Sequence, residues 1–108
     1  MNWLAVYFKI ARACRTPFVF CLDSKYRPWD LYELKRASGS FPKWEYSEEY
    51  ADCDDAAFAF KGHMGHSIGI AIGHGHAWNV ALCNNGIWHI EPQTGEFSQG
   101  KRAKVIII

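Results

Sequence analysis

Hydrophobic residues follow a helical spacing in the first half of the chain. Apolar residues over 2–14 recur at helical intervals, which predicts an amphipathic helix that faces the core, and Asn2 can cap its start. A second helix is expected over residues 28–37, and a third from about residue 52 to 61. Between the first two helices, the apolar run at 18–22 predicts a short buried strand.

After Gly62 the pattern changes to short runs rich in Ile, Val and Trp, separated by turns that contain glycine. Such runs predict consecutive antiparallel strands. They cover residues 67–72, 76–83, 86–90 and 103–108. Helices followed by strands indicate an α+β fold, in which helices from the amino-terminal half pack on a carboxy-terminal antiparallel sheet.

Length and composition are those of a compact globular protein. The 108 residues fit a single domain, 1–108, with no repeat or flexible linker to divide it. Hydrophobic residues make up 49% and charged residues 21%, which argues against disorder. The net charge of +1 offers no general attraction for nucleic acid or an anionic membrane. Because no membrane span or secretory signal is recognised, a cytoplasmic location is expected.

Cys53 differs from the other cysteines because charged residues surround it. Acidic residues followed by good helix formers place Cys53 in the first turn of the third predicted helix. There, unpaired backbone N–H groups and the helix dipole favour a thiolate. Cys14, Cys21 and Cys83 have the spacing of neither a disulfide framework nor a zinc finger, and are expected to be reduced structural thiols.

The aspartates at positions 52, 54 and 55 work against a thiolate, because nearby like charges disfavour ionisation. Three arrangements could offset them: the imidazolium of His76, a turn of Asp54 and Asp55 away from the sulfur to cap the helix, or a bound divalent cation. Oxygen ligands are those that calcium prefers. The sequence leaves these alternatives open, together with the simpler one that the acidic residues only favour the helix start.

A predicted hairpin brings a histidine and a carboxylate together. His76 begins one predicted strand and Glu91 ends the next, across an Asn-Gly turn. If Cys83 and Gly86 close a two-residue loop, Glu91 lies opposite Trp78 on the same sheet face as His76, about 7–8 Å away between backbones. A carboxylate at that position can reach the imidazole.

These residues also support a resemblance to a known family. The motifs are DCDD at 52–55, HAWN at 76–79 and IEPQTGE at 90–96. Their order resembles the core of transglutaminase-like cysteine proteases and, more closely, the papain-like protease domain of the mushroom agglutinin family and its bacterial and phage relatives. The resemblance implies a papain-like or transglutaminase-like core, with Cys53 as nucleophile, His76 as base and Glu91 orienting the histidine. For the mushroom member it also implies calcium dependence, which would involve Asp54 and Asp55 here.

The sequence therefore predicts a cysteine (thiol) protease that hydrolyses peptide or isopeptide bonds through a thioester. Acyl transfer to an amine, as in transglutaminases, uses the same intermediate and is an alternative. A second alternative is a catalytically idle binding module of the same fold, such as a phage-type protein that binds a host factor. A third is a metal-binding protein built on His74 and His76, with His89 or Cys83 as a further ligand.

Three further expectations concern surfaces. Trp78 and Trp44 are candidate walls of a cleft for a peptide or protein substrate. Asn79 projects away from His76 in a regular strand and is expected to be structural. The apolar run at 105–108 could form an exposed edge that pairs with a second copy, which makes a homodimer possible.

Overall fold

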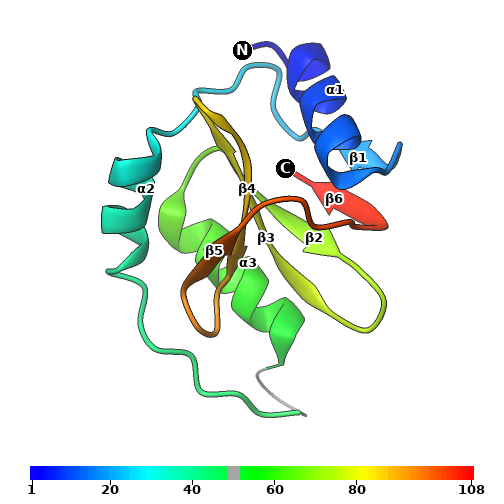
Figure 1. The fold of residues 1–108 in the computed structure, drawn as a ribbon. Coiled ribbons are helices and arrows are strands. Elements are labelled where there is room, and N and C mark those ends of the chain that lie inside the picture. Colours follow the sequence, from blue (N-terminus) through cyan, green and yellow to red (C-terminus); the bar gives the residue numbers. More distant parts are fainter. Residues whose placement is uncertain (49–51) are drawn as a thin grey trace.

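The computed structural model describes residues 1–48 and 52–108 (Figure 1). The helices are α1 (Trp3–Cys14), α2 (Leu31–Ser38) and α3 (Cys53–Met64). The strands are β1 (Val19–Phe20), β2 (Ile68–Ile72), β3 (Ala77–Cys83), β4 (Gly86–Glu91), β5 (Glu96–Ser98) and β6 (Val105–Ile107). The expected α+β class is confirmed, whereas β5 was not predicted.

The strands form one mixed sheet in the order β1-β6-β2-β3-β4-β5. Pairing is antiparallel throughout, except between β1 and β6, which are parallel. The prediction of consecutive antiparallel strands is therefore right for β2 to β4 and wrong for the last strand. β6 returns to the interior of the sheet and lies between β1 and β2 (Figure 1).

This position of β6 contradicts the expected exposed edge at the end of the chain. Ile107 pairs with Phe20 on one side and with Ile70 on the other. Ile106 and Ile108 are buried in the core. Because β1 and β2 pair with β6 on its two edges, β6 offers no free edge to a second copy, and the argument for a homodimer through this strand fails.

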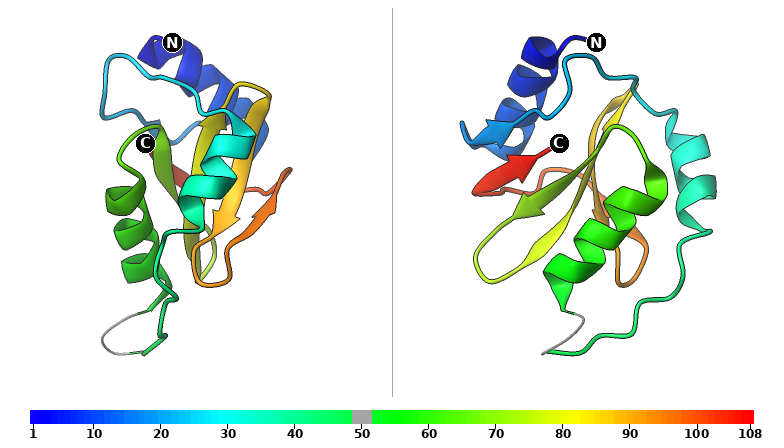
Figure 2. Two further views of the ribbon diagram at one scale, coloured as in Figure 1. Left: turned by 90° about the vertical axis from the view of Figure 1, so that its left-hand side faces the viewer. Right: turned by 180° about the vertical axis from the view of Figure 1, so that it is seen from behind.

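Helices cover both faces of the sheet. The left view of Figure 2 shows α1 on one side of the sheet and α3, with α2 beside it, on the other. Every residue of the central strand β3 is buried, because β3 is covered on both faces. Its even-numbered residues pack in the cluster that includes Val6 and Ile10 of α1. Its odd-numbered residues face α3, and Ala77 packs against Ala57 of that helix.

The first helix follows the sequence prediction closely. Asn2 caps α1, since its Oδ1 accepts a hydrogen bond from the backbone of Ala5 at 2.9 Å. Val6, Ile10 and Cys14 form the buried stripe. In the part of the chain that the structure describes, no helix combines the length and apolar character needed to cross a bilayer, in agreement with the sequence.

The second helix begins later than expected, at Leu31 instead of Pro28. The side chain of Asp30 caps it by accepting from the backbone N–H of Glu33 at 3.1 Å. The preceding residue, Trp29, cannot be helical because its backbone is hydrogen-bonded to the end of the central hairpin: its N–H donates to Leu82 and its carbonyl accepts from Asn84. Tertiary pairing therefore overrides the local helix signal of Pro28.

The predicted buried strand at 18–22 is also corrected. Only Val19 and Phe20 form β1, and of the two only Val19 is buried. Phe18, Phe20 and Leu22 are exposed. β1 lies at an edge of the sheet, and Val19 points to the face that α1 covers, so the alternate side chains point to the other face and remain uncovered.

A substitution at Gly69 of β2 tests the close packing of β2 against β6 and β3. A Cβ there would lie 2.7 Å from the carbonyl oxygen of Ile107 and 2.8 Å from the Cβ of Ile108. We expect Gly69→Ala to lower the free energy of unfolding by about 1–3 kcal/mol because backbone must move. The matched change Gly62→Ala, on the open surface of α3, should raise the free energy of unfolding by up to about 1 kcal/mol. Urea denaturation measures both variants. Similar effects of the two changes would contradict this packing.

Candidate active site

Cys53 is the first residue of α3, as the sequence predicted. Asp52 stands at the N-cap position before it. The thiol is half-buried and packs against a small apolar cluster of Ala57, Ile70 and Ala77.

His76 and Glu91 are in contact: Nε2 of the imidazole lies 2.7 Å from Oε2 of the carboxylate. The hairpin is responsible, because Cys83 pairs with Gly86 across a two-residue loop and the register places Asn79 opposite Ile90. Continued by one residue, this register places Trp78 opposite Glu91, as predicted. Because Glu91 engages Nε2, Nδ1 is the ring nitrogen that can serve a thiol.

The nucleophile candidate and the histidine come from different parts of the fold, the first turn of α3 and the residue before β3. Ala77 follows His76 in the chain and packs in the same cluster as Cys53. Over residues 1–48 and 52–108, no hydrogen bond joins the Cys53 thiol to His76. In unliganded enzymes such contacts are often long and tighten only when substrate is bound. The structure therefore joins the histidine to the acid directly, and places the cysteine beside the residue next to the histidine.

Trp78 supports the imidazole from the core instead of lining a cleft. Its ring stacks on His76, with centroids 5.8 Å apart and planes at 18°. It is only 3% exposed and packs in the α1-side core, so the expectation of a cleft wall is corrected. Its indole Nε1 donates to Nδ1 of His89 at 2.9 Å.

His89 and Lys101 complete the surroundings of Trp78. Burial, with a smaller effect from Lys101, lowers the pKa of His89 to about 4, so the ring is neutral at physiological pH. The ammonium of Lys101 lies 4.3 Å from the centre of the Trp78 ring, a cation–π contact. Sequence reasoning had considered His89 only as a possible metal ligand. Its even spacing from Glu91 along β4, which puts both on one face, is the signal that could have identified it.

Trp44, the other candidate cleft residue, lies in the segment before α3. Its ring stacks on Phe41 with centroids 6.4 Å apart. Phe41 in turn contacts Phe60 on α3, which is buried. Trp44 therefore packs against Phe41 on the helix side of the sheet.

Asn79 ties α3 to the sheet close to Cys53. Its Nδ2 donates to the carbonyl of Ala57 at 2.9 Å and to that of Gly69 at 3.1 Å. The side chain is fully buried and points away from the face that holds Trp78. This confirms the expected structural role.

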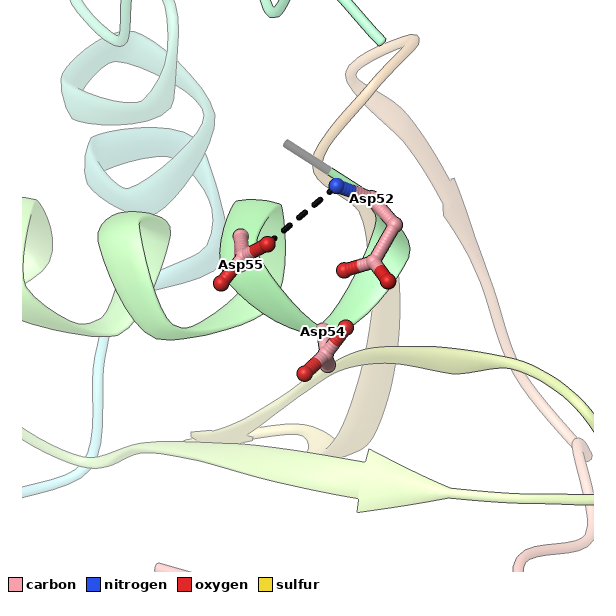
Figure 3. A group of neighbouring side chains, drawn as sticks. All are labelled: Asp52, Asp54 and Asp55. Atoms are coloured by element: carbon pink, nitrogen blue, oxygen red, sulfur yellow. Dashed lines mark hydrogen bonds between the residues drawn. The ribbon is translucent and has the colours of Figure 1, made fainter. Parts of the chain in front are cut away.

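The acidic group beside Cys53 is compact. One carboxylate oxygen from each of Asp52, Asp54 and Asp55 lies within 4.8 Å of the others (Figure 3). The backbone N–H of Asp52 donates to the carboxylate of Asp55 at 3.3 Å, so Asp55 helps to begin the helix. A side-chain hydrogen bond between the other two raises the pKa of Asp54 and lowers that of Asp52. The potential metal ligands are carboxylate oxygens, and they are close enough together for one calcium ion to contact all three.

The alternative metal site built on histidines is not assembled. Nδ1 of His74 lies 3.0 Å from the ammonium of Lys104, and His76 is engaged by Glu91. His89 accepts from Trp78, while Cys83 is buried on the α3 side. Within the described ranges, the aspartates alone form a cluster of three potential metal ligands.

Comparisons with known proteins give a structural similarity. No protein-family model matches the chain, and no curated protein matches it. Among solved structures, the chain is similar to one described as a PSL1a–E64 complex, with a TM-score of 0.79 and 21% sequence identity. The alignment covers 100% of this chain and 50% of that chain, so this chain spans half the length of its structural neighbour. The similarity shows a shared fold.

The cysteines should differ sharply in reactivity. Burial raises the pKa of Cys14 and of Cys83 to about 11 and raises that of Cys21 as well. A thiol with a raised pKa is protonated at neutral pH, with roughly one part in ten thousand as thiolate for a pKa near 11, and is a poor nucleophile. We expect iodoacetamide at pH 7 to label Cys53 first, as read by peptide mass spectrometry. Equal labelling of Cys14 and Cys53 in the folded protein would contradict this, and urea-unfolded protein is the control.

Proposed function

We propose that the chain is a cysteine hydrolase of the papain-like and transglutaminase-like type, which cleaves peptide or isopeptide bonds. Cys53 is the nucleophile, His76 the base and Glu91 the residue that orients the base. The contact of 2.7 Å between His76 and Glu91 carries the proposal, because it gives the histidine a fixed orientation and tautomer.

Two further observations support it. Cys53 opens α3 and packs against the apolar cluster that includes Ala77, the residue that follows His76 in the chain. The neighbour of the same fold was solved as a complex with E64, an inhibitor of cysteine proteases. At 21% identity the similarity does not show that this chain binds E64. The proposal predicts that E64 reacts with Cys53, which makes it a suitable probe.

The proposed reaction has two steps, acylation of Cys53 and hydrolysis of the thioester. Nδ1 of His76 takes the thiol proton of Cys53, and the sulfur attacks the carbonyl carbon of the substrate. The carbon–nitrogen bond breaks, the leaving amine receives the proton from the imidazolium, and a thioester remains on Cys53. Water then attacks the thioester with His76 as base, which releases the acid and restores the thiol. Glu91 stabilises the imidazolium during both steps without accepting its proton.

The decisive variants remove the base and its partner. We expect His76→Ala to lower the rate of peptide cleavage by about 10²–10⁴-fold, because general base catalysis is lost. Glu91→Gln should lower it less, by about tenfold or more, since the histidine stays but its orientation and charge stabilisation weaken. The assay is hydrolysis of a fluorescent unfolded protein, together with the rate of Cys53 labelling by iodoacetamide and by E64.

His74→Ala is the matched control, because His74 lies two residues away on the same turn, is exposed and does not contact Glu91. Its cleavage and labelling rates should equal those of the wild type. Cys53 labelling that is as fast in His76→Ala as in His74→Ala would refute the proposed pair. Products formed with and without an added primary amine then separate hydrolysis from acyl transfer, which share the thioester.

The proposed reaction requires no metal, and calcium is left to a direct test. The thermal unfolding midpoint of the wild type and of Asp54→Asn is compared with and without millimolar calcium. A ligand that binds only the folded state raises this midpoint. A rise that Asp54→Asn abolishes assigns a calcium site to the aspartates, whereas an unchanged midpoint assigns them to the start of α3.

A further inference from the structure

A row of side chains leads from β4 through the core to the proposed base. His89 accepts a hydrogen bond from Trp78 at 2.9 Å, and Trp78 stacks on His76 at 5.8 Å. Glu91, two residues beyond His89 on the same face of β4, holds the other side of the imidazole. The base is thus held by two side chains of β4, one directly and one through Trp78.

The hydrogen bond to Trp78 requires a particular state of His89. An indole N–H is only a donor, so Nδ1 of His89 must present its lone pair, with the ring proton on Nε2. His89 is 2% exposed, and this burial favours the neutral ring. The charged groups that share its surroundings are Lys101, Glu91 and Glu96. A neutral acceptor is therefore available throughout the physiological pH range.

Contacts on its other sides confine the Trp78 ring. Lys101 covers the ring with its ammonium 4.3 Å from the centre. At Gly73 a Cβ would lie 2.8 Å from Cζ3 of Trp78, so the backbone of the turn before β3 packs directly on the ring. That turn carries His76, whose carbonyl accepts from the N–H of Gly73 at 2.8 Å. A shift of the indole would therefore move the turn and the imidazole with it.

We propose that His89 is a positioning residue for His76, acting through its hydrogen bond to Trp78. It sets the rotation of the indole, and the indole sets the plane in which the imidazole meets Glu91. The link to catalysis rests on the proposed function, in which His76 is the base. The effect on the imidazole itself does not, because it can be measured in the absence of any reaction.

Two variants of His89 separate positioning from simple packing. His89→Asn keeps an acceptor, since its Oδ1 can lie near the place of Nδ1, whereas His89→Leu fills similar space and leaves the Trp78 N–H without a partner. We expect the pH midpoint for protonation of His76, followed by NMR of its ring nitrogens, to change in His89→Leu, because the imidazole then meets the carboxylate of Glu91 in a different plane. In His89→Asn it should stay near the wild-type value.

Trp78→Phe is a second route to the same loss, and it creates no unpaired donor. It should reproduce the shift of His89→Leu. The double variant should add little to that shift, because both changes remove the same hydrogen bond between Trp78 and His89. A His76 midpoint that stays at the wild-type value in Trp78→Phe overturns the proposal, even if His89→Leu fails to fold. So does a midpoint that shifts equally in His89→Leu and His89→Asn, since that shift would reflect packing alone.

The labelling rate of Cys53 distinguishes this inference from the proposed function. If both hold, labelling slows by about tenfold in His89→Leu and is restored in His89→Asn. If the midpoint of His76 shifts as expected but Cys53 labelling is the same with and without His76, the positioning role stands and the proposed chemistry fails. If labelling depends on His76 but neither readout responds to His89→Leu, the chemistry stands and the positioning role is refuted.

Discussion

The arrangement of the site depends on one constraint: the central strand β3 is buried on both faces. Alternate side chains of a strand point in opposite directions, so each residue of β3 belongs to one of two layers. Ala77 and Asn79 face α3, where a small side chain and an amide allow the helix to pack closely and to be tied by hydrogen bonds. Trp78 faces α1, where a large ring fills the core. A change of one residue in register would exchange these roles and dismantle the site.

The hairpin of β3 and β4 brings Glu91 into contact with His76. A two-residue loop at Asn84 and Asn85 fixes the register, and the register fixes which acid meets the histidine. The side chain of Glu91 needs no mobile loop to reach His76, because Glu91 is the last residue of β4 and His76 comes directly before β3. The 2.7 Å contact is therefore a consequence of strand pairing more than of the local sequence around either residue.

Local signals explain what could be predicted from the sequence. The acidic residues around Cys53 indicate a helix start, and the Asn-Gly turn indicates the hairpin parity; both features occur in the structure. What failed depends on contacts between distant segments. The return of β6 to the interior of the sheet and the late start of α2 at Leu31 are set by pairing partners that are far away in the chain. The role of His89 was missed for a related reason, since a buried histidine is recognised by its partner and not by its neighbours in sequence.

The position of His76 directly before β3 explains how one residue can be near both layers of the structure. Cys53 lies on the α3 side of the sheet, whereas Glu91, Trp78 and His89 belong to the α1 side. A residue inside the strand would be committed to one face. His76 precedes the first paired residue, Ala77, so its ring can lie at the end of the sheet, with Nε2 toward Glu91. In the proposed function one face of the sheet would supply the nucleophile and the other the group that orients the base, and a proton would pass between them at the end of the strand.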